Sequence, residues 1–325
     1  MVGTVTTDLP LSNVTSGYLD YEETECFGLS HGFMVFAGVC LGISFCGLVG
    51  NGIVMWFLGF HMKQNPFTIY ILNLAVADFS LLLLFFLLIL AVLILARICS
   101  YSYNLIYLYL DFLFVVEFLC HFFDLSSLCL LTAISVERCI SVFYPIWYRC
   151  QRPKHLSGFV SGVVWALAGV FVSSMYLSFN FAKSSETIFS GVAIAISMTL
   201  SSMMLISNLS LFIKLRCGSR RRHPGKLYVA ILLNVIFFFA LGIPFSAEVF
   251  LNLPSSHQLF PENTSFLLAS LNCSINPVVY FLVGCCRQRR LRGSVKVAFC
   301  RVFEEKAVSE EENHVPEDTM VEATV

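Results

Sequence analysis

A chain of 325 residues, of which 57% are hydrophobic and only 13% are charged, is too apolar to be a soluble globular protein. Its mean hydropathy is +0.79 and its formal net charge at pH 7 is −1. We therefore expect an integral membrane protein, with membrane lipid around it and no nucleic-acid partner.

Seven apolar runs are long enough to cross a bilayer as helices, which takes about 20 residues. In chain order they cover residues 32–60, 66–96, 105–139, 156–178, 188–213, 227–252 and 264–285. The predicted fold class is an all-α membrane protein, a bundle of seven transmembrane helices over residues 32–285. Little chain is left for a separate folded domain.

The leader, residues 1–31, holds five acids and no Lys or Arg. It lacks the basic and apolar regions of a cleavable signal peptide, so we expect the first span to direct insertion. Asn13 begins a glycosylation triplet. Cys26 and Cys99 are the two cysteines expected outside the membrane. They either form a disulfide bridge or remain two unrelated thiols, and both alternatives are open.

Polar residues mark the second and third spans. Asp78 is the single acid of the second span, and an ionisable group at that depth is functional by default. In the third span, alternating spacings of four and three place a set of residues on one helical stripe. That stripe contains Glu117, His121, Asp124, Leu128, Leu131, Ser135 and Arg138. A buried helix with acids at one end and Arg138 at the other can sense a ligand on one side and report it on the other.

Proline interrupts the sixth and seventh spans. Pro244, two residues after Gly242, removes a backbone hydrogen bond and is expected to kink the sixth helix, whose outer end carries Glu248. The seventh span contains a second predicted break at Pro277, between Asn276 and Tyr280.

Two segments follow the seventh span. Residues 286–302 alternate basic and apolar positions at near-helical spacing, which predicts a short amphipathic helix on the membrane surface. Cys285, Cys286 and Cys300 are placed there for palmitoylation. Residues 303–325 are dominated by acids and are expected to form a disordered tail.

Basic residues set the expected orientation. All of the 20 Lys and Arg residues except Arg97 and Lys183 fall in loops and ends of one side. By the positive-inside rule the amino terminus is then extracellular and the carboxyl terminus cytoplasmic, in a plasma-membrane protein. Asn263 begins a second glycosylation triplet on the predicted outer face. The alternative for both triplets is that they occur by chance and carry no glycan.

Ordered motifs narrow the class of membrane protein. Gly50-Asn51, Leu74-Ala-Val-Ala-Asp78, Glu137-Arg138-Cys139, Trp165, Pro244 and Asn276-Pro277-Val-Val-Tyr280 each stand in the proper span. Together they resemble a rhodopsin-like (class A) G-protein-coupled receptor. The segments Asn65-Pro-Phe-Thr-Ile-Tyr70, Tyr144-Pro-Ile-Trp-Tyr148 and Tyr280-Phe-Leu-Val-Gly284 look like the Mas-related receptors in particular.

The resemblance implies ligand-triggered nucleotide exchange on a heterotrimeric G protein, with arrestin and receptor kinases as further partners. It implies that Arg138 is held by its neighbour Glu137 and released when the sixth helix moves outward. It also implies a polar cluster that holds a sodium ion in many such receptors, formed here by Asn51, Asp78, Ser127, Asn272 and Asn276. A water-filled polar network without an ion is the open alternative.

Four departures from the family pattern matter. The usual Asp-Arg-Tyr is Glu137-Arg138-Cys139, as in Mas-like receptors, so the Arg is kept. Gly242 stands where a Trp is common, Leu113 stands near the position of an expected cysteine, and Met175 occupies a position where some relatives carry an acid. For the ligand, Glu117, His121, Asp124 and Glu248 predict a negative cavity that favours a cationic peptide or amine. The alternative is that these acids are satisfied structurally, with Glu117 pairing with His121 and Asp124 bonding a neighbouring helix.

Two other classes compete with the receptor. A transporter or channel would use Asp78, Glu117 and Asp124 as an ion path, but the sequence shows no internal repeat. An enzyme would need metal ligands, yet the candidates Asp111, Glu117, His121 and Asp124 all come from one helix and lack a recognised spacing. We therefore predict a receptor that is not an enzyme and carries no cofactor beyond an allosteric sodium ion.

Overall fold

The computed structural model describes residues 31–62, 65–98, 103–181, 185–217, 226–244, 246 and 263–285. Its elements are α1 (His31–Phe60), α2 (Pro66–Ile98), α3 (Tyr103–Phe143), α4 (Pro145–Cys150), α5 (Leu156–Phe181), α6 (Ser185–Cys217), α7 (Lys226–Phe237), the π-helical turn η1 (Phe238–Gly242) and α9 (Asn263–Cys285). Six of these helices are long and apolar enough to cross a membrane, and the shorter Tyr228–Gly242 is the seventh apolar segment among the described residues. The all-helical membrane fold is thus confirmed.

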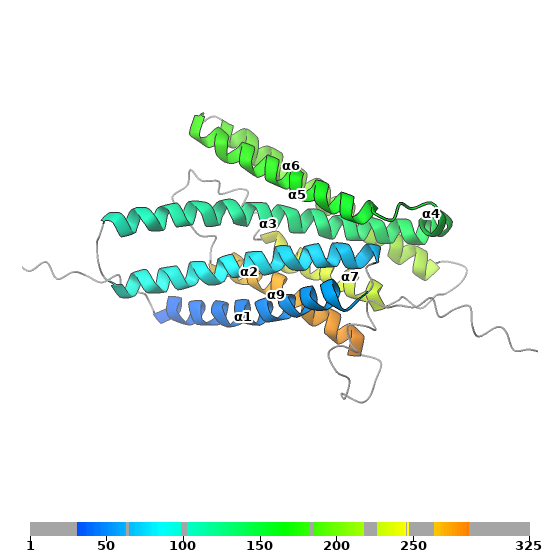
Figure 1. Ribbon diagram of the computed structural model, residues 1–325, viewed down its shortest axis with the longest axis horizontal. Helices are drawn as coiled ribbons and strands as arrows, with labels where there is room; N and C mark the ends of the chain where they lie inside the picture. The colour runs from blue at the N-terminus through cyan, green and yellow to red at the C-terminus, as the bar shows by residue number, and fades with distance from the viewer. Residues whose placement is uncertain are drawn as a thin grey trace, which may run out of the picture.

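Helix α3 lies at the centre of the bundle. It packs against α2, α5, α6 and α7, while α1 packs on α2 and α9, and α7 packs on α9. Figure 1 shows α1, α2 and α3 side by side along the long axis, with the short α4 beyond the end of α3. Because α3 touches most of the other helices, it is placed to connect the two ends of the bundle through packed neighbours.

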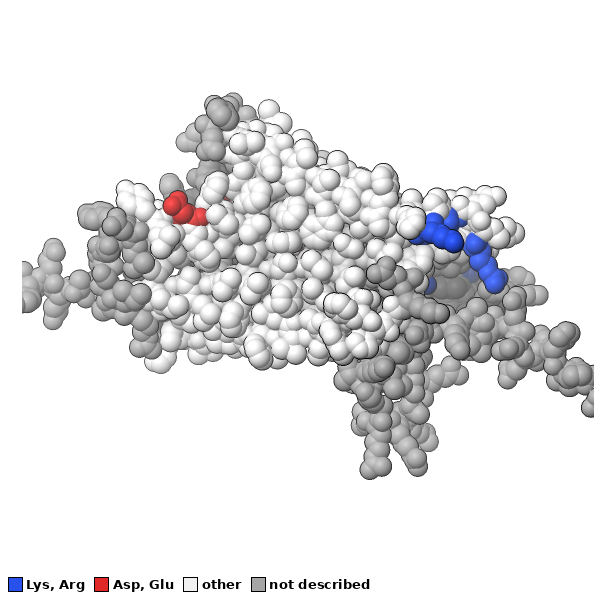
Figure 2. Space-filling view, in the orientation of Figure 1, with Lys and Arg blue, Asp and Glu red and all other residues white. Residues whose placement is uncertain are grey.

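The outside of the bundle is apolar, as a lipid environment requires. Large hydrophobic side chains such as Val35, Phe159 and Ile188 are exposed by 67%, 70% and 68%. By contrast, the exposed charged side chains within the described residues lie near the ends: the basic Arg149, Lys154 and Lys214, and the acidic Asp111. Figure 2 shows basic side chains at one end of the molecule and acidic ones at the opposite end.

Three apolar clusters fill the core of the described residues, and two of them lie in opposite halves of the bundle. One includes Phe85, Leu113 and Phe266; the other includes Tyr70, Leu128 and Tyr280. On each of four helices a polar residue falls between the stretches that build the two clusters: Asn51 in α1, Asp78 in α2, Ser127 in α3 and Asn276 in α9. We call these four residues the polar layer.

The two proline-containing spans differ from each other. Before Pro244 the helix widens into η1, where the Ile243 backbone N–H bonds to the Phe238 carbonyl oxygen five residues earlier. The predicted irregularity is present, but as a π-turn one turn before the proline. The predicted break at Pro277 is wrong, because α9 continues through it. The Asn51 amide accounts for this in part, because it donates at 3.0 Å to the Cys273 carbonyl oxygen, which loses its helical N–H donor at Pro277 four residues later. Gly50 leaves room for the Pro277 ring, since a Cβ there would stand 3.1 Å from it.

Where the structure describes them, the helix ends agree with the predicted spans within three residues, except that α3 continues to Phe143 and α6 to Cys217, each four residues beyond the predicted end. Several predictions lie outside the described residues: the leader with Asn13 and Cys26, then Cys99, Glu248, Cys286, Cys300, the membrane-surface helix and the acidic tail. Asn263 and Cys285 mark the ends of α9, and their side chains are also outside the description.

Candidate functional site

The acidic stripe of α3 lies in the half of the bundle opposite Arg138. His121 is 2% exposed, and its Nδ1 lies 2.8 Å from the backbone carbonyl oxygen of Glu117 and 3.2 Å from the Tyr176 hydroxyl of α5. The Tyr176 ring meets the rings of Phe114 and Phe118 edge-on, each at 5.2 Å between centroids. His121 is therefore fixed within an aromatic wall, and the half-buried Glu117 lies one turn away on the same face.

Asp124 is the buried acid of the stripe, with 8% of the residue exposed. The Ser246 hydroxyl donates to its Oδ1 at 3.1 Å, which joins α3 to the segment beyond Pro244. Its Oδ2 is buried and has no hydrogen-bond partner within the described part of the chain. The predicted hydrogen bond from Asp124 to a neighbouring helix is thus present, and it uses only one of the two carboxylate oxygens.

The polar layer forms a hydrogen-bonded network around Asp78, which is 1% exposed. Ser127 donates to Oδ1 of Asp78 at 3.3 Å, and Asn276 donates to Oδ2 at 2.6 Å. The Asn51 amide donates to the backbone carbonyls of Gly47 and Cys273, both at 3.0 Å. One carboxylate, one hydroxyl and nearby amides are oxygen donors that suit a small hard cation, so the residues fit a sodium ion as well as a network without one.

Asn272 belongs to the same predicted set and lies against η1. A Cβ on Gly242 would stand 3.1 Å from the Asn272 amide nitrogen and 2.8 Å from the Phe238 ring. The space that a side chain would need at position 242 is thus already filled by Phe238 and Asn272. This packing explains in physical terms why Gly stands there.

A second link joins α7 to α9. The Asn234 amide donates to the Tyr280 hydroxyl at 3.0 Å, and both residues are buried, at 2% exposure each. Tyr280, which the sequence predicts to be functional, therefore has a hydrogen-bond partner, Asn234, that sequence reasoning missed. Asn234 gives little sequence signal, because a single Asn in an apolar run has many potential partners.

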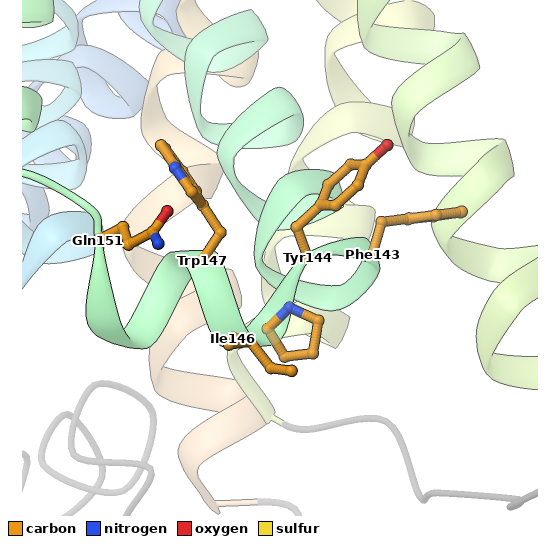
Figure 3. Close-up of a pocket in the computed structure, with 6 residues that line it drawn as sticks. Phe143, Tyr144, Ile146, Trp147 and Gln151 are labelled. Carbon is orange, nitrogen blue, oxygen red and sulfur yellow. The ribbon is translucent and has the colours of Figure 1, made fainter.

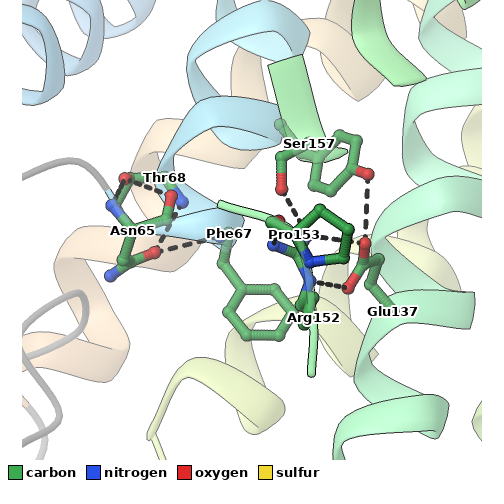
Figure 4. A network of polar contacts seen from close by, with 8 residues as sticks. Asn65, Phe67, Thr68, Glu137, Arg152, Pro153 and Ser157 are labelled. Atoms are coloured by element: carbon green, nitrogen blue, oxygen red, sulfur yellow. Dashed lines mark hydrogen bonds and ion pairs between the residues drawn. The ribbon is translucent and has the colours of Figure 1, made fainter. Parts of the chain in front are cut away.

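At the Arg138 end, the structure corrects one expectation. Glu137 does not pair with Arg138 but with Arg152, whose Nη2 lies 2.8 Å from Oε1 and whose Nε lies 3.3 Å from Oε2. The Tyr70 hydroxyl donates to Oε1 at 3.2 Å, and Arg152 Nη2 also donates to the Ser157 hydroxyl at 2.6 Å. Figure 4 shows this network between α2, α3 and the start of α5.

Helix geometry explains the correction. Residues i and i+1 point in directions about 100° apart around a helix, so neighbouring side chains do not face each other. Arg138 instead places its guanidinium carbon 3.8 Å from the centroid of the Phe67 ring. Phe67 is held at the start of α2 by Asn65, whose Oδ1 accepts from the Phe67 and Thr68 backbone N–H groups at 3.0 and 2.9 Å. This cap therefore fixes the aromatic surface under Arg138.

Charge and burial act together on Arg152 and Tyr148. Burial alone would lower the pKa of Arg152, but the hydrogen bond and negative charge of Glu137 outweigh it and raise that pKa, so the guanidinium stays charged. Burial, and then the Glu137 charge, raise the pKa of the Tyr148 hydroxyl, which stays neutral. Within the ion pair, Arg152 therefore keeps its charge beside the neutral Tyr148 hydroxyl.

Next to this network, the turn from α3 into α4 carries an open groove of about 360 Å³. Its lining, drawn in Figure 3, consists of Phe143, Tyr144, Pro145, Ile146, Trp147 and Gln151. Ile146 is 80% exposed and Tyr144 65%. Both lie just beyond the candidate membrane span that ends at Phe143, so this apolar surface stands at the edge of the span.

Trp165 has a role beyond packing. Its ring contacts Phe122 and Phe123, as expected for a packing residue, and its Nε1 also donates to Asn73 Oδ1 at 2.9 Å. It therefore ties α5 to α2 beside α3.

Comparison with known proteins agrees with this architecture. Residues 50–280 match the family model of the 7 transmembrane receptors (rhodopsin family). The chain is 36% identical over 278 residues to "Proto-oncogene Mas" of Mus musculus, covering 82% of this chain and 83% of that protein. It is 38% identical over 280 residues to "Mas-related G-protein coupled receptor member X2" of Homo sapiens, covering 82% of each.

These matches decide between the three classes considered from the sequence. The matched proteins are receptors, neither transporters nor enzymes, which confirms the prediction that the chain is not an enzyme. The motifs around Asp78, Arg138, Pro244 and Tyr280 fall inside the matched range. The chain therefore belongs to the rhodopsin family of G-protein-coupled receptors, among Mas and the Mas-related receptors.

Proposed function

We propose that this receptor binds a cationic ligand beside Glu117 and Asp124 and promotes nucleotide exchange on a heterotrimeric G protein at the end that carries Arg138. The observation that carries the ligand half is the state of Asp124. One of its oxygens accepts from Ser246, and the other is buried without a hydrogen-bond partner in the described chain.

A buried carboxylate oxygen without a partner is costly, and a cation that reaches it removes that cost. An ammonium or guanidinium group supplies both the charge and the N–H donors. Glu117 lies two turns along the same face of α3, so a ligand with a second basic group has a second acid within the same stripe. These features favour a basic peptide or an amine over an anionic ligand.

The G-protein half is supported by the groove at α4. Exposed apolar and aromatic side chains, Ile146, Tyr144 and Trp147, stand beside the exposed cations Arg149 and Lys154. An apolar centre with aromatic residues and a charged rim is typical of protein–protein interfaces. A partner that docks there also lies next to Arg138 and Glu137, the two residues that the family motif marks for activation.

The orientation is part of the proposal. Basic side chains at the α4 end favour that end as cytoplasmic, which leaves the amino terminus and the Glu117 end outside, at the plasma membrane. The expected glycans on Asn13 and Asn263 follow from this orientation. The test is the electrophoretic mobility of the receptor before and after glycosidase treatment. We expect the wild type to change mobility and the Asn13→Gln, Asn263→Gln double variant not to change. A wild type whose mobility does not change would contradict the predicted glycans.

Ligand charge is tested with a panel of basic peptides and amines on cells that express a chimeric G protein. Asp124→Asn keeps the shape of the side chain and is expected to weaken a cationic agonist about tenfold or more, since about 1.4 kcal/mol corresponds to one decade. Asp111→Asn is the matched control, because Asp111 is an exposed acid on the same helix. A neutral or anionic agonist whose potency ignores Asp124→Asn and Glu117→Gln would show that these acids are structural.

A further inference from the structure

Arg152 is a buried cation outside any helix. It lies between α4 and α5, yet its side chain is only 4% exposed, and that of Glu137 is 11% exposed. The last turn of α4 fixes its backbone, because the Arg152 N–H donates to the Trp147 carbonyl oxygen at 3.1 Å. A guanidinium is taken out of water at a loop position only where charge and hydrogen bonds compensate it. Here its partners are Glu137 and Ser157.

Arg152 occupies both oxygens of Glu137. Oε1 accepts from Arg152 and Tyr70, and Oε2 accepts from Arg152. The acid that the family motif places beside Arg138 is thus committed to the loop before α5 and to α2. Glu137 forms its ion pair with Arg152 and not with Arg138, which leaves a route to Arg138 through Arg152.

A stack of side chains supplies that route. The Arg138 guanidinium lies 3.8 Å from the centroid of the Phe67 ring. The Phe67 ring stacks on the Tyr148 ring, with 6.0 Å between the centroids and 20° between the planes. The Arg152 guanidinium in turn lies 5.1 Å from the centroid of the Tyr148 ring. Each cation is attracted to the face of its ring. Arg152 and Arg138 therefore cover opposite ends of one aromatic pair.

Resting on the proposed coupling to a G protein, we propose that Arg152 is the positioning residue of the activation switch. It holds Glu137 and Tyr148 in place and so keeps Arg138 on Phe67 of α2 in the resting receptor. The proposal assigns this ion pair and this stack to the resting state alone, so release of Arg152 shifts the population toward the state in which Arg138 faces the G protein. The segment between α4 and α5, next to the α4 groove, is then where a docked G protein acts on Arg138.

Arg152→Gln tests this role. Basal nucleotide exchange per surface receptor is expected to rise about fivefold or more, the range of a typical coupling between two states. Lys154→Gln is the matched control, since it removes an exposed cation of the docking surface two residues away and leaves the Glu137 contacts in place. It is expected to leave basal exchange at or below the wild-type level, so a rise is specific to Arg152→Gln. Arg152→Lys keeps the charge but loses the two-pronged contact, so its basal exchange is expected between wild type and Arg152→Gln.

A double-mutant cycle separates this mechanism from direct pairing of Glu137 with Arg138. If Arg152 holds Glu137, then Arg152→Gln and Glu137→Gln each raise basal exchange, and the double variant rises no further than the larger single effect. Direct pairing predicts a rise for Glu137→Gln alone. A silent Arg152→Gln beside an active Glu137→Gln overturns the proposal, and so do effects that multiply in the double variant.

The proposal stays testable even if Arg152→Gln is not expressed at the cell surface. If Arg152→Gln alone fails to reach the surface because Glu137 is left without its cation, the double variant lacks both charges and is measured in its place. Raised basal exchange there supports the proposal, and wild-type exchange overturns it. The failure of the proposed function is a different result: no ligand-dependent or basal exchange by the wild type with any G protein, although the receptor is at the surface.

Discussion

At the scale of single residues, hydrogen-bond partners distinguish the buried acids in the two halves of α3, since Asp124 and Glu137 are each 8% exposed. Asp124 has one carboxylate oxygen without a hydrogen-bond partner in the described chain, whereas both oxygens of Glu137 accept hydrogen bonds. We propose that the first arrangement suits a ligand that brings positive charge and that the second suits a switch that changes partners.

Gly242 is the residue whose replacement is expected to damage packing most clearly. Gly242→Ala introduces a Cβ that meets Phe238 at 2.8 Å and Asn272 at 3.1 Å. Overpacking of this kind costs about 1–3 kcal/mol, so the variant is expected to unfold in detergent at a lower temperature than wild type. Gly38→Ala is the control, because nothing lies within 4 Å of a Cβ there. Equal melting temperatures for the two variants would contradict the close packing at η1.

At the scale of elements, the bond between Asn234 of α7 and Tyr280 of α9 opposes an outward movement of α7. Asn234→Leu removes this bond. Hydrogen bonds between membrane helices contribute about 0.6 kcal/mol on average, which corresponds to a rise of about threefold in basal exchange if the bond exists in the resting state alone.

The matched control for that change is Asn208→Leu. The Asn208 amide donates to the Met204 carbonyl within α6, so its loss leaves α7 and α9 joined. Basal exchange per surface receptor is the measurement for both variants. An Asn234→Leu receptor no more active than Asn208→Leu would mean that the bond does not distinguish the two states.

Sequence periodicity was sufficient for most elements and for some of the site. Apolar runs located the spans, and the three-four spacing placed Glu117, Asp124 and Arg138 on one face. The pairing of Glu137 with Arg152 was not predictable, because it depends on where the turn after α4 places a loop residue 15 positions away. The continuity of α9 through Pro277 was missed for a similar reason, since the Asn51 amide that bonds the Cys273 carbonyl comes from another helix.

At the scale of the whole molecule, the polar layer separates the two apolar clusters and lies between the ligand end and the Arg138 end. Both oxygens of Asp78 already accept hydrogen bonds from α3 and α9. A sodium ion held by Asp78, Ser127 and the nearby amides would stabilise the arrangement of the helices in which these side chains lie close together. We propose this ion site for the resting receptor.

Sodium is therefore expected to lower agonist affinity or basal exchange in the wild type, and Asp78→Asn is expected to abolish the difference between sodium and an equal concentration of a large organic cation. The matched ionic strength controls for screening. An identical response of the wild type in both salts would favour a hydrogen-bonded network without an ion.

The central claim is that α3 connects a ligand at its acidic end to a G protein at Arg138. The most direct test is agonist-dependent nucleotide exchange by purified G protein with wild-type receptor and with Arg138→Ala, at equal amounts of surface or reconstituted receptor. We predict that Arg138→Ala abolishes exchange while agonist binding and expression stay largely intact. Exchange at the wild-type rate from Arg138→Ala would contradict the account.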